Sequence, residues 1–277
     1  MPRSGPTSLT LPPFAGATRR LILLNLAAFF TIAILSLFSR GLTTFLLSHL
    51  ALTPYALVHG QLWQLVTYAF LNFGLLSTLF ALLTLWFTGS MLEGENGPRW
   101  LYELYFVSVI GGALLASAFS YTHLFGLHPA AVSAAGPYSG LFGLLIAIGV
   151  LFGDQEFLLF FVLRIKARYL VAIYILIELA TLLKEQDAFN ALIQLTGGLC
   201  GYLFLRLAPR RGLAHGVTER YFALRNDFYR NKRRRAARKF EVYMKKQDRE
   251  VHFDKDGRYI DPDTLNPRDP NDKRWMN

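Results

Sequence analysis

Ser139 is the residue of this chain whose type and position best suit nucleophilic chemistry. It lies in Ala134–Val150, where an opening that contains Gly and Pro runs directly into an apolar helix. A serine hydroxyl is a weak nucleophile by itself, and it needs a nearby base that takes its proton. Whether Ser139 is reactive therefore depends on the residues that the rest of the chain brings to it.

The histidines do not form an evident base or metal site. His49 and His59 lie in one connection and His123 and His128 in another, and we interpret all four as interfacial or solvated loop residues. Their spacing does not match that of metal ligands, so we expect neither a metal ion nor another cofactor. The single cysteine, Cys200, lies in an apolar run and leaves no partner for an internal disulfide.

The elements that must position these residues are apolar helices. Of the 277 residues, 53% are hydrophobic and 17% are charged, and the charges gather at the chain ends and in short gaps. This segregation indicates a polytopic membrane protein. We predict an all-α fold, a bundle of six transmembrane helices at Leu21–Phe38, Leu65–Leu92, Trp100–Tyr121, Tyr138–Phe152, Tyr169–Leu183 and Ala191–Leu207.

Composition divides the chain into three regions. Residues 1–20 are rich in Pro, Ser and Thr and predict a disordered cytoplasmic N-terminus. Residues 21–208 predict the membrane domain, and residues 209–277 a cytoplasmic basic tail. Within the membrane domain we expect a structured or interfacial loop over residues 39–63 and an interfacial segment over residues 153–168.

The distribution of basic residues predicts the orientation. Only two basic residues, Arg40 and Lys184, lie in the connections on one side of the predicted spans. The tail and a larger group of basic residues lie on the other side. By the positive-inside rule this larger group is cytoplasmic, and so are both termini. We expect a multi-pass protein of a bacterial inner membrane. The larger group consists of Arg3, Arg19, Arg20, Arg99, Arg164, Lys166 and Arg168.

Several motifs, taken in order, resemble the rhomboid family of intramembrane serine proteases. GQLWQLVTYAFLN precedes the second apolar segment, Gly89 and Glu93 lie near its end, GGALL occurs in the third and GGLCGYLFLRL in the sixth. Their order and spacing over Trp63–Leu207 carry the resemblance. It implies a nucleophilic Ser in the fourth helix, a His in the sixth as its base, and a His and an Asn in the second that stabilise the oxyanion.

Compared position by position, the resemblance implies a degenerate catalytic set. The two glycines that follow the family's base His match Gly197 and Gly201, which places Gln194 where the His is expected. A carboxamide does not titrate near neutral pH, so Gln194 cannot take a serine proton. The family's polar positions in the second helix fall on Asn72, Ser77 and Ala81.

Two registers remain open for the nucleophile. Aligned without a gap on Gly136 and Gly143, the family pattern places Tyr138 at the nucleophile position. Ser139 then follows one residue later, turned by about 100° away from the catalytic face. The alternative register keeps Ser139 and Gly140 as the family's Ser-Gly pair but displaces both glycines by one residue. We favour the register without a gap.

Helix packing by itself accounts for the glycines of these segments, because small residues let membrane helices approach closely. Glu178 is an acid inside the fifth apolar segment. It indicates either a functional group or a carboxyl that pairs or stays protonated, and both interpretations remain open. The glycines that we expect at helix contacts are Gly111, Gly112, Gly136, Gly140, Gly143, Gly197 and Gly201.

The tail carries most of the net charge of +10, with 19 Lys and Arg against 11 Asp and Glu from residue 210 onward. Residues 219–247 predict a long helix, residues 250–260 a hairpin, and residues 261–272 an extended segment that suits a cytoplasmic partner. A basic cluster just inside the last span is attracted to the anionic inner leaflet. We do not expect nucleic acid, the rival partner. The cluster consists of Lys232, Arg233, Arg234, Arg235, Arg238 and Lys239.

Together these features predict a rhomboid-like pseudoprotease that binds transmembrane segments of client proteins without cleaving them. The alternative is a divergent intramembrane serine endopeptidase that uses Ser139. Transport is a weaker third class, because charges within the spans are few and inverted repeats are not evident.

Overall fold

The computed structural model describes residues 12–123, 126–159, 163–184, 187–207, 213–246, 251–255 and 259–260. The chain divides into two compact units, Met1–Gly212 and Leu213–Asn277. The predicted disorder of residues 1–11 and the predicted extended end over residues 261–272 lie outside the described residues.

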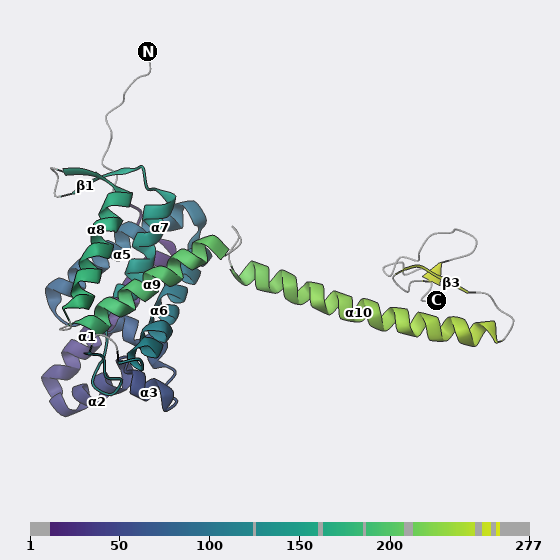
Figure 1. The fold of residues 1–277 in the computed structure, drawn as a ribbon, viewed down its shortest axis with the longest axis horizontal. Helices are drawn as coiled ribbons and strands as arrows, with labels where there is room; N and C mark the ends of the chain where they lie inside the picture. The colour runs from purple at the N-terminus through teal and green to yellow at the C-terminus, as the bar shows by residue number, and fades with distance from the viewer. Residues whose placement is uncertain are drawn as a thin grey trace, which may run out of the picture. The chain divides into compact units, whose positions relative to one another are not determined.

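The regular elements in the described part of the first unit are helices, apart from one short hairpin and an isolated bridge between Leu52 and Ala134, so the predicted all-α class is confirmed (Figure 1). The hairpin pairs β1 (Glu156–Leu159) with β2 (Leu163–Lys166), and it occupies the predicted interfacial segment. In Figure 1 this hairpin lies at one end of the unit, and α2 and α3 lie at the opposite end. The helices are α1 (Gly16–Phe38), α2 (Arg40–Leu50), α3 (Pro54–Val58), α4 (Gln64–Thr67), the 3-10 turn η1 (Tyr68–Phe70), α5 (Leu75–Asn96), α6 (Pro98–Ser120), α7 (Tyr138–Leu151), α8 (Ala167–Leu183) and α9 (Ala188–Leu207).

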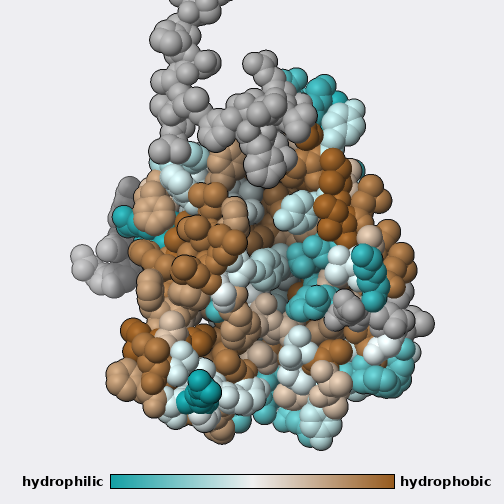
Figure 2. Space-filling model, turned by 90° about the vertical axis from the view of Figure 1, so that its left-hand side faces the viewer, coloured by the Kyte–Doolittle hydropathy of each residue, from teal (hydrophilic) through white to brown (hydrophobic). Residues whose placement is uncertain are grey.

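Four of the described helices, α1, α5, α6 and α9, are long and apolar enough to cross a membrane, and α7 is a shorter apolar helix of 14 residues. Large apolar side chains cover much of the surface. Leu37 and Phe38 of α1, for example, are 84% and 83% exposed. Figure 2 shows hydrophobic side chains spread over one face of this unit. Such a surface suits hydrocarbon and is unfavourable in water.

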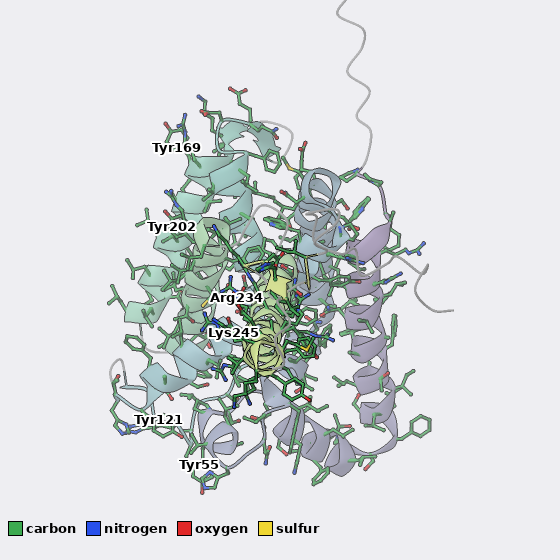
Figure 3. The ribbon with its side chains drawn as sticks, turned by 90° about the vertical axis from the view of Figure 1, so that its right-hand side faces the viewer. Tyr55, Tyr121, Tyr169, Tyr202, Arg234 and Lys245 are labelled. Carbon is green, nitrogen blue, oxygen red and sulfur yellow. The ribbon has the colours of Figure 1, made fainter. Side chains whose placement is uncertain are left out.

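Tyrosines lie near both ends of the first unit. Tyr169 lies at one end, whereas Tyr55 and Tyr121 lie at the other (Figure 3). The Tyr121 hydroxyl donates a hydrogen bond to the Pro54 carbonyl at 3.2 Å. Tyrosine is enriched where a membrane meets water, because its ring is apolar and its hydroxyl is polar.

The second apolar segment differs from the prediction. A helix is predicted over Leu65–Leu92, but residues 64–70 form α4 and η1, and α5 runs from Leu75 to Asn96. Gly74, which precedes α5, has a φ of 84°, in the region that favours glycine. The backbone therefore breaks at a position that apolar content alone does not reveal. The predicted loop over residues 39–63 likewise contains α2 and α3.

Glu93, near the end of α5, fixes the beginning of α1. Its Oε1 accepts a hydrogen bond from the Ala17 N–H at 2.7 Å, and its Oε2 accepts from the Thr18 N–H at 2.9 Å and the Thr18 hydroxyl at 2.7 Å. A carboxylate at a helix N-terminus satisfies donors that have no partner within the helix and interacts favourably with the helix dipole. Residues 16–20 are thus helical, although they belong to the region predicted to be disordered.

The centre of the first unit is the contact between α6, α7 and α9, against which α8 packs, and α1 packs mainly on α5. Tyr105, Val109 and Leu144 are completely buried there. The glycines described below bring these three helices close together, so the candidate nucleophile at the start of α7 lies in the most densely packed part of the unit.

The second unit consists of α10 (Leu213–Lys245) and a hairpin of β3 (His252–Phe253) and β4 (Tyr259–Ile260), which pair antiparallel. The hairpin folds onto α10, because the rings of Phe240 and Phe253 meet edge-on at 6.3 Å and the Arg234 side chain donates to the Lys255 carbonyl. A long helix and a hairpin thus stand where the sequence predicts them, although α10 begins six residues before the predicted Glu219.

Candidate functional site

Ser139 lies in the first turn of α7, where only 1% of its surface is exposed. Its hydroxyl donates a hydrogen bond to the Ser108 carbonyl of α6 at 2.9 Å. A methyl group placed on Gly112 or on Gly197 would overlap Ser139 Oγ. Ser139 is therefore enclosed by α6 and α9, and its hydroxyl proton is directed to a backbone carbonyl, which is not a base near neutral pH.

Gln194, the residue at the expected base position, points to a different neighbour. Its Nε2 donates to Glu178 Oε2 of α8 at 3.2 Å. Ser139 faces α9 about one helical turn further along, at Gly197, so it is not turned away from this helix as the register without a gap predicts. Among the described residues no hydrogen bond joins Ser139 to Gln194. Glu178 thus pairs with a neutral amide. This agrees with one of the two interpretations of Glu178, a carboxyl that pairs or stays protonated.

Tyr138, the alternative occupant of the nucleophile position, is 37% exposed. Its ring lies against Gly136, whose φ of 114° and contact with this ring leave no room for a side chain. A phenol hydroxyl that has no adjacent base is a weak nucleophile. Tyr138 thus occupies the start of α7 without an acid or base partner among the described contacts.

The three positions expected from the second helix do not converge on Ser139. Asn72 is buried and donates from Nδ2 to Asn25 Oδ1 of α1 at 3.0 Å. Ser77 is exposed and donates to the carbonyls of Phe73 and Gly74, within its own turn. Ala81 is buried and carries no polar group. Asn72 therefore contacts α1, Ser77 bonds within its own turn, and Ala81 has no polar group to offer a substrate.

Buried polar side chains that the sequence does not predict lie between Asn72 and α6. Asn25 Nδ2 donates to the Leu21 carbonyl at 2.9 Å, and the Tyr68 hydroxyl donates to the Val109 carbonyl at 2.9 Å. Burial raises the pKa of Tyr68 well above its usual value, so this phenol stays protonated and acts as a donor. The one available signal was Asn25, a polar residue inside an apolar run.

The glycines at the helix contacts allow backbone to approach backbone. Methyl groups placed on Gly112 and on Gly201 would each lie 2.9 Å from a glycine Cα of the neighbouring helix, Gly197 and Gly143 respectively. A methyl group on Gly111 would overlap Cys200, and one on Gly140 would overlap the ring of Tyr105. These contacts join α6, α7 and α9 through small residues, a common solution in membranes.

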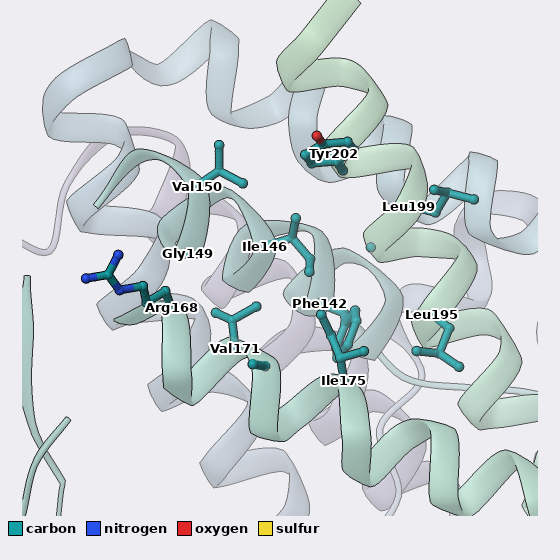
Figure 4. A pocket seen from close by; sticks show the side chains of 12 residues that line it. Phe142, Ile146, Gly149, Val150, Arg168, Val171, Ile175, Leu195, Leu199 and Tyr202 are labelled. Atoms are coloured by element: carbon teal, nitrogen blue, oxygen red, sulfur yellow. The ribbon is translucent and has the colours of Figure 1, made fainter. Parts of the chain in front are cut away.

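An apolar cavity of about 420 Å³ lies between α7, α8 and α9 (Figure 4). Phe142, Val171 and Leu195 are among the residues that line it. Arg168 also borders the cavity, and its guanidinium pairs with Asp154 at 2.6 Å. Among the described residues, the lining of this cavity contains no serine, histidine or carboxylate.

The four histidines interact locally, and His49 lies in the last turn of α2 rather than in the loop that the sequence predicts. His49 Nδ1 lies 2.9 Å from the Phe45 carbonyl, and His59 Nδ1 lies 2.7 Å from the Tyr55 carbonyl. The rings of His123 and His128 face each other at 5.4 Å. Within the described ranges, no three His, Cys, Asp or Glu residues are grouped as metal ligands.

Comparison with known proteins gives two similarities. A family model described as "Eukaryotic integral membrane protein (DUF1751)" matches residues 22–233. Rhomboid-like protein 19 of Arabidopsis thaliana is 28% identical over 154 residues, which is 54% of this chain and 49% of that protein. The chain therefore spans about half the length of this curated relative.

Proposed function

The chain belongs to the rhomboid-like family of eukaryotic integral membrane proteins (DUF1751), and we propose that it is a pseudoprotease that binds transmembrane segments of client proteins without cleaving them. It is a multi-pass membrane protein, and the match extends from α1 into α10. The family is eukaryotic, which makes the expected bacterial inner membrane doubtful.

The environment of Ser139 is the observation that carries this proposal. Its hydroxyl donates to a backbone carbonyl, and Gln194 of α9 donates to Glu178 rather than to the serine. In serine hydrolases the nucleophile and its base act as a unit, and loss of either typically lowers kcat by several orders of magnitude. A packed and unactivated serine supports a role for the bundle in binding rather than in hydrolysis.

We further propose that the membrane domain has six spans, with α7 and α8 added to the four long apolar helices. Both termini and the tail are then cytoplasmic. Supporting this orientation, Arg19, Arg99 and Arg168 lie at the N-terminal ends of α1, α6 and α8. Glu93 joins the beginning of α1 to the end of α5, immediately before α6.

Reaction with a fluorophosphonate probe tests the proposal at the serine. We expect the purified chain in detergent to show no more labelling than Ser139→Ala, while an active rhomboid protease in the same detergent is labelled. Transmembrane clients are expected to be crosslinked by both the wild-type chain and Ser139→Ala. Labelling of the wild type that disappears in Ser139→Ala would instead support the divergent protease.

A further inference from the structure

One face of α10 presents basic and apolar side chains without an acid. Successive members are three or four residues apart, so they lie along one stripe of the helix. All are exposed, including the large apolar side chains of Phe228 and Val242, at 67% and 60%. This basic stripe consists of Arg225, Phe228, Lys232, Arg235, Lys239 and Val242.

The hairpin covers part of the opposite face of α10, around Ala237. Ala237 is the buried residue there, at 8% exposure, and Arg234 and Phe240 on either side of it contact Lys255 and Phe253 of the hairpin segment. At about 100° per residue, Ala237 lies nearly opposite the middle of the basic stripe. Asp227 and Glu241, the acids of α10 whose side chains the structure describes, also lie off the stripe. In the described part of α10 the stripe is therefore free of acids and is not covered by the hairpin, although basic residues also lie on the other sides of the helix.

We propose that the basic stripe docks on the phosphate groups of an anionic membrane surface. Only residues 208–212 separate α10 from α9, which is long and apolar enough to span. Five extended residues reach at most about 18 Å, so the beginning of α10 stays close to the bilayer. A basic residue near such a surface contributes about fivefold to binding. Phe228 and Val242 can enter the headgroup region between the charges.

Only three of the six residues in the predicted basic cluster lie on the stripe. Lys232, Arg235 and Lys239 belong to the stripe, whereas Arg234 contacts the hairpin. Arg233 and Arg238 are exposed and lie off the stripe. A diffuse attraction between a basic tail and lipid would use all six residues equally, but an oriented helix would not.

Amide hydrogen exchange of the full chain in nanodiscs distinguishes these cases. We expect exchange in α10 to slow when phosphatidylserine is added to phosphatidylcholine discs, and to recover at high salt because screening shortens the reach of surface charge. The triple reversal Lys232→Glu, Arg235→Glu and Lys239→Glu is expected to abolish this slowing, since three charges correspond to about a hundredfold in affinity.

The matched control makes the same change of charge off the stripe, with Arg233→Glu, Arg238→Glu and Lys245→Glu, and it should retain most of the slowing. If both triple variants lose the phosphatidylserine-dependent slowing of exchange equally, the proposal of an oriented stripe is overturned. Absence of any phosphatidylserine effect, or slowing by added RNA in discs without anionic lipid, would overturn the membrane surface as its partner. Because both leaflets of a disc have the same lipids, the result does not depend on the proposed orientation or on client binding.

Discussion

Ser139, Gly112 and Gly197 lie in contact where α6, α7 and α9 pack together. The two glycines have no side chain, and this leaves the space that Ser139 occupies. A methyl group at Gly197 would overlap Ser139 Oγ and lie 2.9 Å from the Ser139 carbonyl oxygen. Backbone atoms cannot move aside as a flexible side chain can. The serine therefore acts as a small packing residue whose hydroxyl is satisfied by Ser108.

Gly197→Ala is expected to destabilise the first unit by about 1–3 kcal/mol, the usual cost of added volume in a packed contact. The midpoint of thermal unfolding in detergent measures this change. Gly41→Ala in α2 is the matched control, because nothing lies within 4 Å of the added methyl group. Equal midpoints for the two variants would contradict the close contact at Gly197.

At the scale of elements, α1 is held to the bundle at two polar points. Glu93 binds its first turn, and Asn25 near its middle accepts from Asn72. Most of the helix surface between and beyond these points is exposed and apolar. In a bilayer, apolar contacts between helices compete with lipid on nearly equal terms, so such polar contacts determine where α1 lies.

Glu93→Gln should weaken the docking of α1, because the amide nitrogen cannot accept from Thr18 and the negative charge at the helix N-terminus is lost. Each lost hydrogen bond to a charged group contributes about 1–3 kcal/mol. Hydrogen exchange of the amides of residues 16–25 reports the change. Glu95→Gln, at an exposed position two residues further along α5 and about half a turn around it, supplies the control. If both variants exchange alike, Glu93 does not anchor α1.

For the whole molecule, the sequence predicted what depends on composition and order, namely the all-α class, the apolar helices and the resemblance to rhomboids. The break at Gly74 and the β1–β2 hairpin were not predicted, because a short apolar run is compatible with helix or strand. Within the candidate site, the sequence predicts Gln194 at the position where the resemblance implies a base, and this stays a prediction. The pairing of Gln194 with Glu178 and the contact of Ser139 with Gly197 depend on how α7, α8 and α9 pack.

We propose that this bundle has a rhomboid-like architecture and does not hydrolyse peptide bonds. Cleavage of a transmembrane substrate in liposomes tests it most directly, with an active rhomboid protease as the positive control. We expect the wild-type chain to yield no more product than Ser139→Ala or protein-free liposomes. A product that forms with the wild-type chain and disappears in Ser139→Ala would contradict it.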